Sequence, residues 1–223
     1  MKIVYSLGGS LLADQDRDGL LRYANELKEL AKEHRIYVVV GGGRYARKYI
    51  EKARDLKVSE AFCDMIGINI SKVNAILLMA ALGDDAAMLP EDYFEAAQTS
   101  APGKVVVMGG VALGQTTDAV SALLAELVKA DRLVIATNVD GVFSADPNVD
   151  PSAKKYDHMT PKKLVQIAMM TEMKAGSKSA IDPLAAKIIE RSSIPTAVVN
   201  GRELENLKRG AMGGHQGTEI RSK

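Results

Sequence analysis

The sequence predicts an α/β fold, a three-layer αβα sandwich built around a mainly parallel central sheet. Short apolar runs such as residues 36–40 lack polar alternation, which is typical of strands buried on both faces. Between them lie amphipathic runs with apolar residues at helical spacing, such as residues 20–31. Because strands and helices alternate along the chain, we expect parallel strands joined by right-handed crossovers.

Local sequence signals predict the strands and helices along the chain. Buried strands are expected at residues 3–7, 36–40, 105–108, 133–136 and 196–199, with weaker strand signals at 88–90 and, at a sheet edge, 217–221. Helices are expected over residues 16–35, 44–53, 59–82, 92–98, 117–129, from 160 onward, and 182–191. Asp16 or Asp18, Thr160 and Asp182 can cap three of them. Turn signals at Asp140-Gly141 and Asp146-Pro147 predict a short hairpin within residues 139–147.

Length and composition restrict the class of protein. The 223 residues suit one domain with two lobes on a continuous sheet, which we place at residues 1–130 and 131–223. A net charge of +1 and an aromatic content of 4% argue against nucleic acid as a partner. Cys63 is the only cysteine, which excludes an internal disulfide and fits a reducing compartment. No apolar run approaches the roughly 20 residues of a membrane span, so we expect a cytoplasmic protein without membrane contact.

Three of the predicted strands run into paired glycines: Gly8-Gly9-Ser10, Gly41-Gly42-Gly43 and Gly109-Gly110. Glycine allows a sharp turn and lets a ligand approach the backbone closely. A helix that begins there offers free N–H groups and its positive dipole end to an anion. Ligands of open α/β sheets bind beyond the carboxyl ends of the strands, so the three turns predict one site for several phosphates. The alternative is that each pair is an ordinary tight turn.

The residues near these turns suit phosphoryl transfer, which needs positioned phosphates and neutralised charge more than a nucleophile. There is no Walker-type G-x-x-x-x-G-K-[ST] sequence. Residues 41–46 match the G-x-G-x-x-A dinucleotide fingerprint, so an NAD-dependent enzyme is an alternative, although the match does not follow the first strand. The groups available to bind phosphate or to orient Mg²⁺ are those of Arg44, Arg47, Lys178, Thr116, Thr117 and Asp118.

Four segments together resemble one known family: Leu7-Gly8-Gly9-Ser10, Val40-Gly41-Gly42-Gly43, Thr116-Thr117-Asp118 and the run TNVDGVFSADP at residues 137–147. The pattern is similar to that of the amino acid kinase superfamily and extends from residue 2 to the last strand. Within it, residues 43–50, 64–67 and 181–187 closely resemble the archaeal-type uridylate kinases. Members of that family transfer the γ-phosphate of ATP to UMP in pyrimidine biosynthesis, use Mg²⁺ with ATP, and are typically hexamers.

The resemblance implies a role for each matching residue. ATP would be bound by Gly9, Ser10, Gly43, Arg47, Thr137, Asn138, Phe143 and Asp146, with the adenine packed on Phe143. UMP would be held by Gly42, Asp64, Val111, Ala112, Leu113, Gly114, Gln115, Thr116 and Thr117, with Asp64 at the sugar. The transfer itself would depend on Asp118, Arg47 and Lys178. No dedicated metal ligand is implied, since Mg²⁺ would arrive with ATP.

One position departs from the superfamily. Many members have lysine two residues before the first Gly-Gly pair, where this chain has Ser6. The usual cation on the transferred phosphate is therefore missing or comes from elsewhere, and Arg47 and Lys178 are the candidates. Two other functions stay open, a related phosphotransferase such as an isopentenyl phosphate kinase, and a nucleotide-binding regulator without catalysis.

Overall fold

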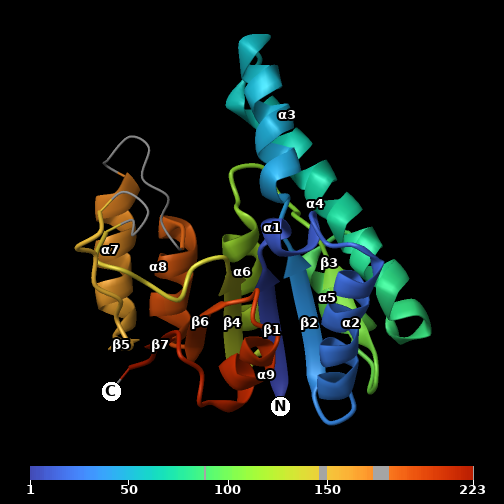
Figure 1. The fold of residues 1–223 in the computed structure, drawn as a ribbon. Helices are drawn as coiled ribbons and strands as arrows, with labels where there is room; N and C mark the ends of the chain where they lie inside the picture. Colours follow the sequence, from blue (N-terminus) through green and yellow to red (C-terminus); the bar gives the residue numbers. More distant parts are fainter. Residues whose placement is uncertain (88, 146–149, 173–180, 223) are drawn as a thin grey trace.

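A seven-stranded sheet lies between two layers of helices in the computed structural model, which describes residues 1–87, 89–145, 150–172 and 181–222 (Figure 1). The strand order is β3-β2-β1-β4-β6-β7-β5, and every neighbouring pair is parallel except β6 and β7. The predicted mainly parallel sandwich is confirmed. The strands are β1 (Lys2–Leu7), β2 (Arg35–Val40), β3 (Val105–Met108), β4 (Arg132–Thr137), β5 (His158–Met159), β6 (Thr196–Asn200) and β7 (Thr218–Ile220).

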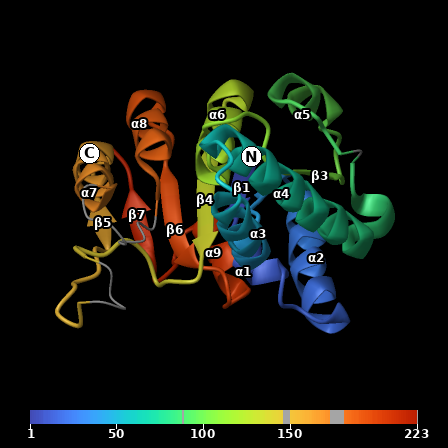
Figure 2. The same ribbon diagram turned by 90° about the horizontal axis from the view of Figure 1, so that it is seen from above.

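The helices form two layers on the sheet. α5 to α8 contribute to the core on one face, and α1, α2, α4 and α9 to the core on the other; Figure 2 shows α6 and α8 opposite α2 and α9. α3 packs on α4 and projects beyond the sheet (Figure 1). The helices are α1 (Gly9–Leu12), α2 (Arg17–Ala31), α3 (Gly43–Asp55), α4 (Glu60–Leu82), α5 (Tyr93–Thr99), α6 (Thr117–Val128), α7 (Pro161–Glu172), α8 (Pro183–Ser192) and α9 (Glu205–Met212), with a 3₁₀ turn, η1, at Gly83–Asp85.

The central strands are buried on both faces, as their unbroken apolar runs predict. In β2, Tyr37 and Val39 point into one core, and Val38 and Val40 point into the other. Successive side chains of a strand alternate between its faces, so a strand covered by helices on both sides has no polar position. The two cores hold the carboxyl ends of the strands in fixed positions.

Helix starts follow the predicted caps. Asp16 Oδ1 accepts a hydrogen bond from Gly19 N at 2.8 Å, which makes Asp16 rather than Asp18 the cap of α2. Thr160 Oγ1 accepts from Lys163 N at 3.2 Å at the start of α7. Asp182 caps α8 in the same way. Each contact satisfies N–H groups that have no partner inside the helix.

Some predictions for short strands and turns are wrong. β7 is not an edge strand, because β5 pairs with its outer side. In the segment expected to form a hairpin, residues 139–147, Phe143 forms an antiparallel bridge with the distant Lys155, and residues 146 and 147 lie outside the described residues. Near the weak strand signal, Ala86 makes the bridge to β3, residues 89–90 lie in no strand, and residue 88 is outside the described residues. All these pairings depend on distant partners rather than on local sequence.

α4 contradicts the expectation that no apolar run approaches the length of a membrane span. The segment Glu60–Asp85 is long and apolar enough to cross a bilayer by length and composition alone. In the fold, however, the helix contacts α2, α3, β2 and β3, and buries Ala75, Leu78 and Leu82 in the core. It is therefore an integral helix of the domain. Its outer face exposes large apolar side chains, those of Phe62, Met65, Val73, Ile76 and Leu77.

Candidate active site at the carboxyl edge of the sheet

The three glycine turns lie at one edge of the sheet. β1, β2 and β3 are parallel neighbours, in which Leu7 stands beside Val40 and Val39 stands beside Met108. The turns that follow these strands therefore leave the sheet at the same edge, as predicted. Figure 1 shows α1 and α3 starting above this edge.

The turns after β1 and β2 touch each other. A Cβ atom on Gly9 would lie 2.1 Å from the carbonyl oxygen of Gly41 and 2.4 Å from Gly43 N, which no side chain could tolerate. Gly43 also has a φ of +63°, in the left-handed region that favours glycine. Gly9 and Gly43, both predicted to bind ATP, thus form one packed unit that requires glycine.

This glycine unit has the properties of an anion site. α1 begins at Gly9, and α3 begins at Gly43 with Gly42 as its N-cap, so N–H groups that have no partner inside a helix gather here. Arg47, near the start of α3, donates from Nη2 to Ser10 Oγ at 3.3 Å and so bridges the two turns. Its side chain is exposed. Helix N-termini beside an arginine suit a phosphate group.

The start of α6 carries two hydroxyl groups, one of which lies beside the turn after β2. Thr116 caps the helix, since its Oγ1 accepts a hydrogen bond from Ala119 N at 3.1 Å. Thr117 Oγ1 lies 3.2 Å from the position that a Cβ on Gly41 would occupy. Thr117, one of the two threonines that the sequence associated with phosphate, therefore adjoins the turn after β2.

The carboxyl group of Asp118 lies beside the carboxyl end of β1, next to Ser6. Ser6 Oγ donates to Asp118 Oδ1 at 2.6 Å. Burial raises the pKa of Asp118 to about 6; the hydrogen bond from Ser6 opposes this rise and the charge of Asp182 adds to it. Asp182 itself accepts a hydrogen bond from Thr116 Oγ1. A carboxyl with a perturbed pKa beside an anion site is typical of a functional group.

Ser6 places a neutral group where the superfamily has lysine. Its side chain is buried and bound to Asp118, so β1 supplies no cation at this position. Arg44 is engaged in an ion pair with Asp14 at 2.6 Å. Arg47 is the predicted cation that the structure brings to the glycine turns. Lys178 lies outside the described residues.

The loop before α6 is tied to α4 and α5. Gly114 N donates to Asp64 Oδ2 at 2.7 Å, and the hydroxyl of Tyr93 donates to Gln115 Oε1. Asp64 and the loop, which the resemblance assigned separately to UMP, are therefore brought together. The other side chains of the loop range from partly buried to exposed: Val111, Ala112 and Leu113.

The structure describes three of the four residues that are expected to bind adenosine. β4 pairs in parallel with β1, so Thr137 and Asn138 reach the same edge of the sheet, and Thr137 Oγ1 donates to Asn138 Oδ1 at 3.4 Å. Phe143 is partly buried in the segment that bridges to Lys155. Asp146 lies outside the described residues.

Comparison with known proteins decides the family. The model of the amino acid kinase family matches residues 1–200. The chain belongs to the amino acid kinase family. Uridylate kinase of Methanothrix thermoacetophila is 57% identical over 223 residues, which covers 100% of both chains. Uridylate kinase of Archaeoglobus fulgidus is 49% identical over 220 residues, 99% of this chain and 100% of that relative.

Solved structures of the family share this fold. The crystal structure of uridylate kinase from Archaeoglobus fulgidus matches with a TM-score of 0.89 and 48% identity, over 99% of this chain and 100% of that one. UMP kinase from Bacillus anthracis matches with a TM-score of 0.81 over 99% of this chain and 95% of that one, and at 24% identity it supports the fold alone. The family resemblance and the fold predicted from the sequence are confirmed.

Sequence reasoning missed three polar residues at this family's glycine turns. Ser71 Oγ accepts from Gly110 N at 2.7 Å, and Asn74 Nδ2 donates to Gly41 O at 2.8 Å. Asp182 was expected only as a helix cap, yet its charge also acts on the site. The available signal was a pair of small polar residues three positions apart in the apolar stretch of α4, on one face of the helix.

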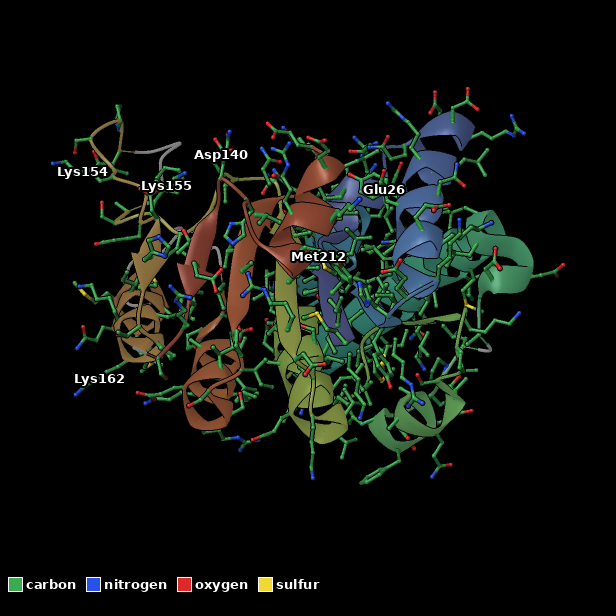
Figure 3. All side chains as sticks on the ribbon, turned by 90° about the horizontal axis from the view of Figure 1, so that it is seen from below. Glu26, Asp140, Lys154, Lys155, Lys162 and Met212 are labelled. Atoms are coloured by element: carbon green, nitrogen blue, oxygen red, sulfur yellow. The ribbon has the colours of Figure 1, made fainter. Side chains whose placement is uncertain are left out.

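A cavity of about 720 Å³ lies at the opposite edge of the sheet and contains none of the predicted site residues. Lys155 and Met212, which help to line it, are labelled in the view from below (Figure 3). Beside it, Arg132 and Glu219 form an ion pair at 2.7 Å. Burial would raise the pKa of Glu219, but hydrogen bonds with His215 and Arg132 outweigh it and lower the pKa to about 2. This edge is stabilised by charge pairing, and its glycines, Gly213, Gly214 and Gly217, follow α9 and do not stand at the carboxyl ends of β1, β2 and β3.

Proposed function

We propose that this chain is a UMP kinase, which transfers the γ-phosphate of ATP to UMP and releases UDP and ADP, a step of pyrimidine nucleotide biosynthesis. The observation that carries the proposal is the meeting of the β1 and β2 glycine turns with Asp118 and with the loop before α6. Full-length similarity to proteins named uridylate kinases supports it.

The proposal divides the substrates between two sets of residues. Residues 1–130 hold UMP and the phosphates, and residues 131–223 hold the adenosine of ATP. The ATP set is Gly9, Ser10, Gly43, Arg47, Thr137, Asn138, Phe143 and Asp146. The UMP set is Gly42, Asp64 and the loop residues Val111, Ala112, Leu113, Gly114, Gln115, Thr116 and Thr117.

The reaction needs charge and position rather than a protein nucleophile. A phosphate oxygen of UMP forms a bond to the γ-phosphorus, and the bond from that phosphorus to the β–γ bridging oxygen, which leaves with ADP, breaks. The glycine N–H groups hold the two phosphate chains in line. Arg47 neutralises charge on the phosphates, with Lys178 as a second cation, and Asp118 orients the groups around the transferred phosphoryl.

Mg²⁺ is proposed to enter with ATP. The described residues contain no group of three or more His, Cys, Asp or Glu side chains that could hold a metal alone. Mg²⁺ in kinases commonly binds one or two carboxylates together with substrate phosphates. Asp118, influenced by the charge of Asp182 and adjoining the phosphate turns, fits that requirement. When bound, the ion neutralises negative charge on the phosphates.

Self-association is proposed as well, with the family's typical hexamer as the expected assembly. Phe62, Val73 and Ile76 on the outer face of α4 are each about half exposed, and a large apolar patch usually marks an interaction surface. Sedimentation of the purified chain as a monomer at micromolar concentration would contradict this part of the proposal. A cytoplasmic location is proposed with it, supported by the single cysteine, Cys63.

A panel of phosphate acceptors tests the proposed activity. The purified chain receives Mg-ATP together with UMP, CMP, AMP or isopentenyl phosphate, and ADP release is followed. UMP should be phosphorylated far faster than the other acceptors. Equal turnover of isopentenyl phosphate would favour the related phosphotransferase, and nucleotide binding without transfer to any acceptor would favour a regulator.

A further inference from the structure

Asn74 is a buried amide on α4 that contacts the glycine turn after β2. Its side chain is among the buried polar groups of the described residues, with a relative exposure of 6%. Nδ2 donates to Gly41 O at 2.8 Å and to Gly42 O at 3.3 Å. Both contacts cross from the helix to the turn, so Asn74 holds two successive carbonyl groups of that turn against α4.

These contacts fix the direction of two N–H groups. In a planar trans peptide, the carbonyl oxygen of one residue and the N–H of the next point in opposite directions. With the carbonyls of Gly41 and Gly42 held toward Asn74, the N–H groups of Gly42 and Gly43 point away from α4. The same turn packs against the β1 turn, since a Cβ on Gly9 would lie 2.1 Å from Gly41 O and 2.4 Å from Gly43 N. The held conformation is therefore the one in which the two glycine turns fit together at the candidate anion site.

Glycine residues do not hold such an orientation by themselves. Three in succession, Gly41 to Gly43, have more accessible backbone conformations than any other tripeptide of the chain, and no side chain of their own to anchor them. A buried donor that binds two of their carbonyl groups selects one conformation.

The same face of α4 holds the neighbouring turns. One turn of helix before Asn74, Ser71 Oγ accepts from Gly110 N at 2.7 Å, after β3. Two turns earlier still, Asp64 accepts from Gly114 N at 2.7 Å. The positions 64, 71 and 74 follow helical spacing, so one rigid element sets the distance between the phosphate turn and the predicted UMP loop.

We propose that Asn74 is a positioning residue for phosphoryl transfer, which holds the Gly41 and Gly42 carbonyls against α4 and thereby keeps the N–H groups of Gly42 and Gly43 directed at the phosphates. The proposal rests on the proposed kinase activity of this site. Asn74 touches no reacting atom itself; it acts through the backbone of the turn.

The test compares Asn74→Ala and Asn74→Ser with the control Asn69→Ala. Asn69 lies on the same helix, is exposed, and donates only to Met65 O of its own helix, at 2.8 Å. Serine is included because its hydroxyl can return a hydrogen bond to its own helix, which avoids an unsatisfied buried group. Circular dichroism first establishes a temperature at which each variant is fully folded. At that temperature, kcat with ATP and UMP and the Kd for inorganic tripolyphosphate are measured.

Both Asn74 variants should lose about 10- to 100-fold in kcat, the size of effect that a misplaced phosphate produces. Their Kd for tripolyphosphate should rise about tenfold or more, which corresponds to about 1.4 kcal/mol. Asn69→Ala should stay within twofold of wild type in both. A folded Asn74 variant with wild-type kcat and Kd overturns the proposal. So does failure of both Asn74 variants to fold while Asn69→Ala folds, because Asn74 would then serve stability alone.

Measuring both kcat with UMP and the Kd for tripolyphosphate distinguishes failure of this proposal from failure of the proposed kinase activity. If the wild-type chain transfers no phosphate to UMP, the proposed function fails. Tripolyphosphate binding by wild type and variants then still shows whether Asn74 orients the turn.

Discussion

Replacing Asp118 by asparagine should make the chain more stable and less active at once. The carboxyl has a pKa of about 6 in the folded protein, against 3.8 for the free side chain. Between these values the folded state binds the proton more tightly than the unfolded chain, so stability falls as pH rises from about 4 to about 6. Above that window the ionised carboxylate is destabilising by about 3 kcal/mol, at about 1.36 kcal/mol for each pKa unit.

The substitution Asp118→Asn leaves the packing in place, because the amide has the same size and its oxygen can still accept from Ser6. The variant should therefore gain up to about 3 kcal/mol at pH 8, or roughly 6–12 °C in Tm for a chain of this length, and gain nothing at pH 4. Loss of the charge near the transferred phosphate should lower kcat by about 100-fold or more.

The assay is thermal unfolding followed by circular dichroism from pH 4 to pH 8, with kcat measured at pH 8. Asp55→Asn is the matched control, since Asp55 is an exposed carboxylate at the end of α3; its effect should stay within about 0.5 kcal/mol at every pH. The reasoning is refuted if Asp118→Asn is no more stable than wild type at pH 8, or if its gain is equal at pH 4 and pH 8.

Three further predictions concern separate parts of the fold. Asp64→Ala should raise the KM for UMP at least about tenfold and leave the KM for ATP within twofold, because the carboxylate belongs to the proposed UMP set and accepts from Gly114 N of the loop in that set. Equal changes in both steady-state KM values would contradict this. Gly43→Ala should destabilise the fold by at least about 1–3 kcal/mol in denaturant titration, since its φ is +63° and its Cβ would lie 2.5 Å from Gly9 C; unchanged stability would contradict the clash. Glu219→Gln should lower the free energy of unfolding by about 2 kcal/mol at pH 7 once solvent screening is allowed for, because His215 and Arg132 lower the pKa of Glu219 to about 2. The difference between variant and wild type should disappear as the pH falls from 4.5 toward 2. A constant difference in an acid titration followed by circular dichroism would exclude this cause.

The parts of the fold that local sequence encodes were predictable. The unbroken apolar run at residues 36–40 identifies β2, because only a strand covered on both faces needs no polar position. The glycines behind it identify the site, because a turn that must contact another backbone has no room for a Cβ. Asp16 and Asp182 identify helix starts through the N–H groups that they satisfy.

What could not be predicted depends on residues that are far apart in the chain. The pairing of Ser6 with Asp118 spans 112 positions, so nothing near Ser6 indicates that its hydroxyl is occupied. β5 has two residues and exists only because β7 offers it an edge. α4 contains an apolar stretch of membrane-spanning length that was not expected, because Asp64 and Lys72 interrupt its run of apolar residues.

Glycine N–H resonances test the central claim most directly, that the turns at the carboxyl edge bind phosphate. The chain has 19 glycines, and selective ¹⁵N-glycine labelling would report them in one spectrum. On addition of tripolyphosphate, the signals of Gly9, Gly42 and Gly43 should shift, while Gly213 and Gly214, which line the cavity at the opposite edge, should not. Shifts at Gly213 and Gly214 with none at the three turn glycines would contradict the account.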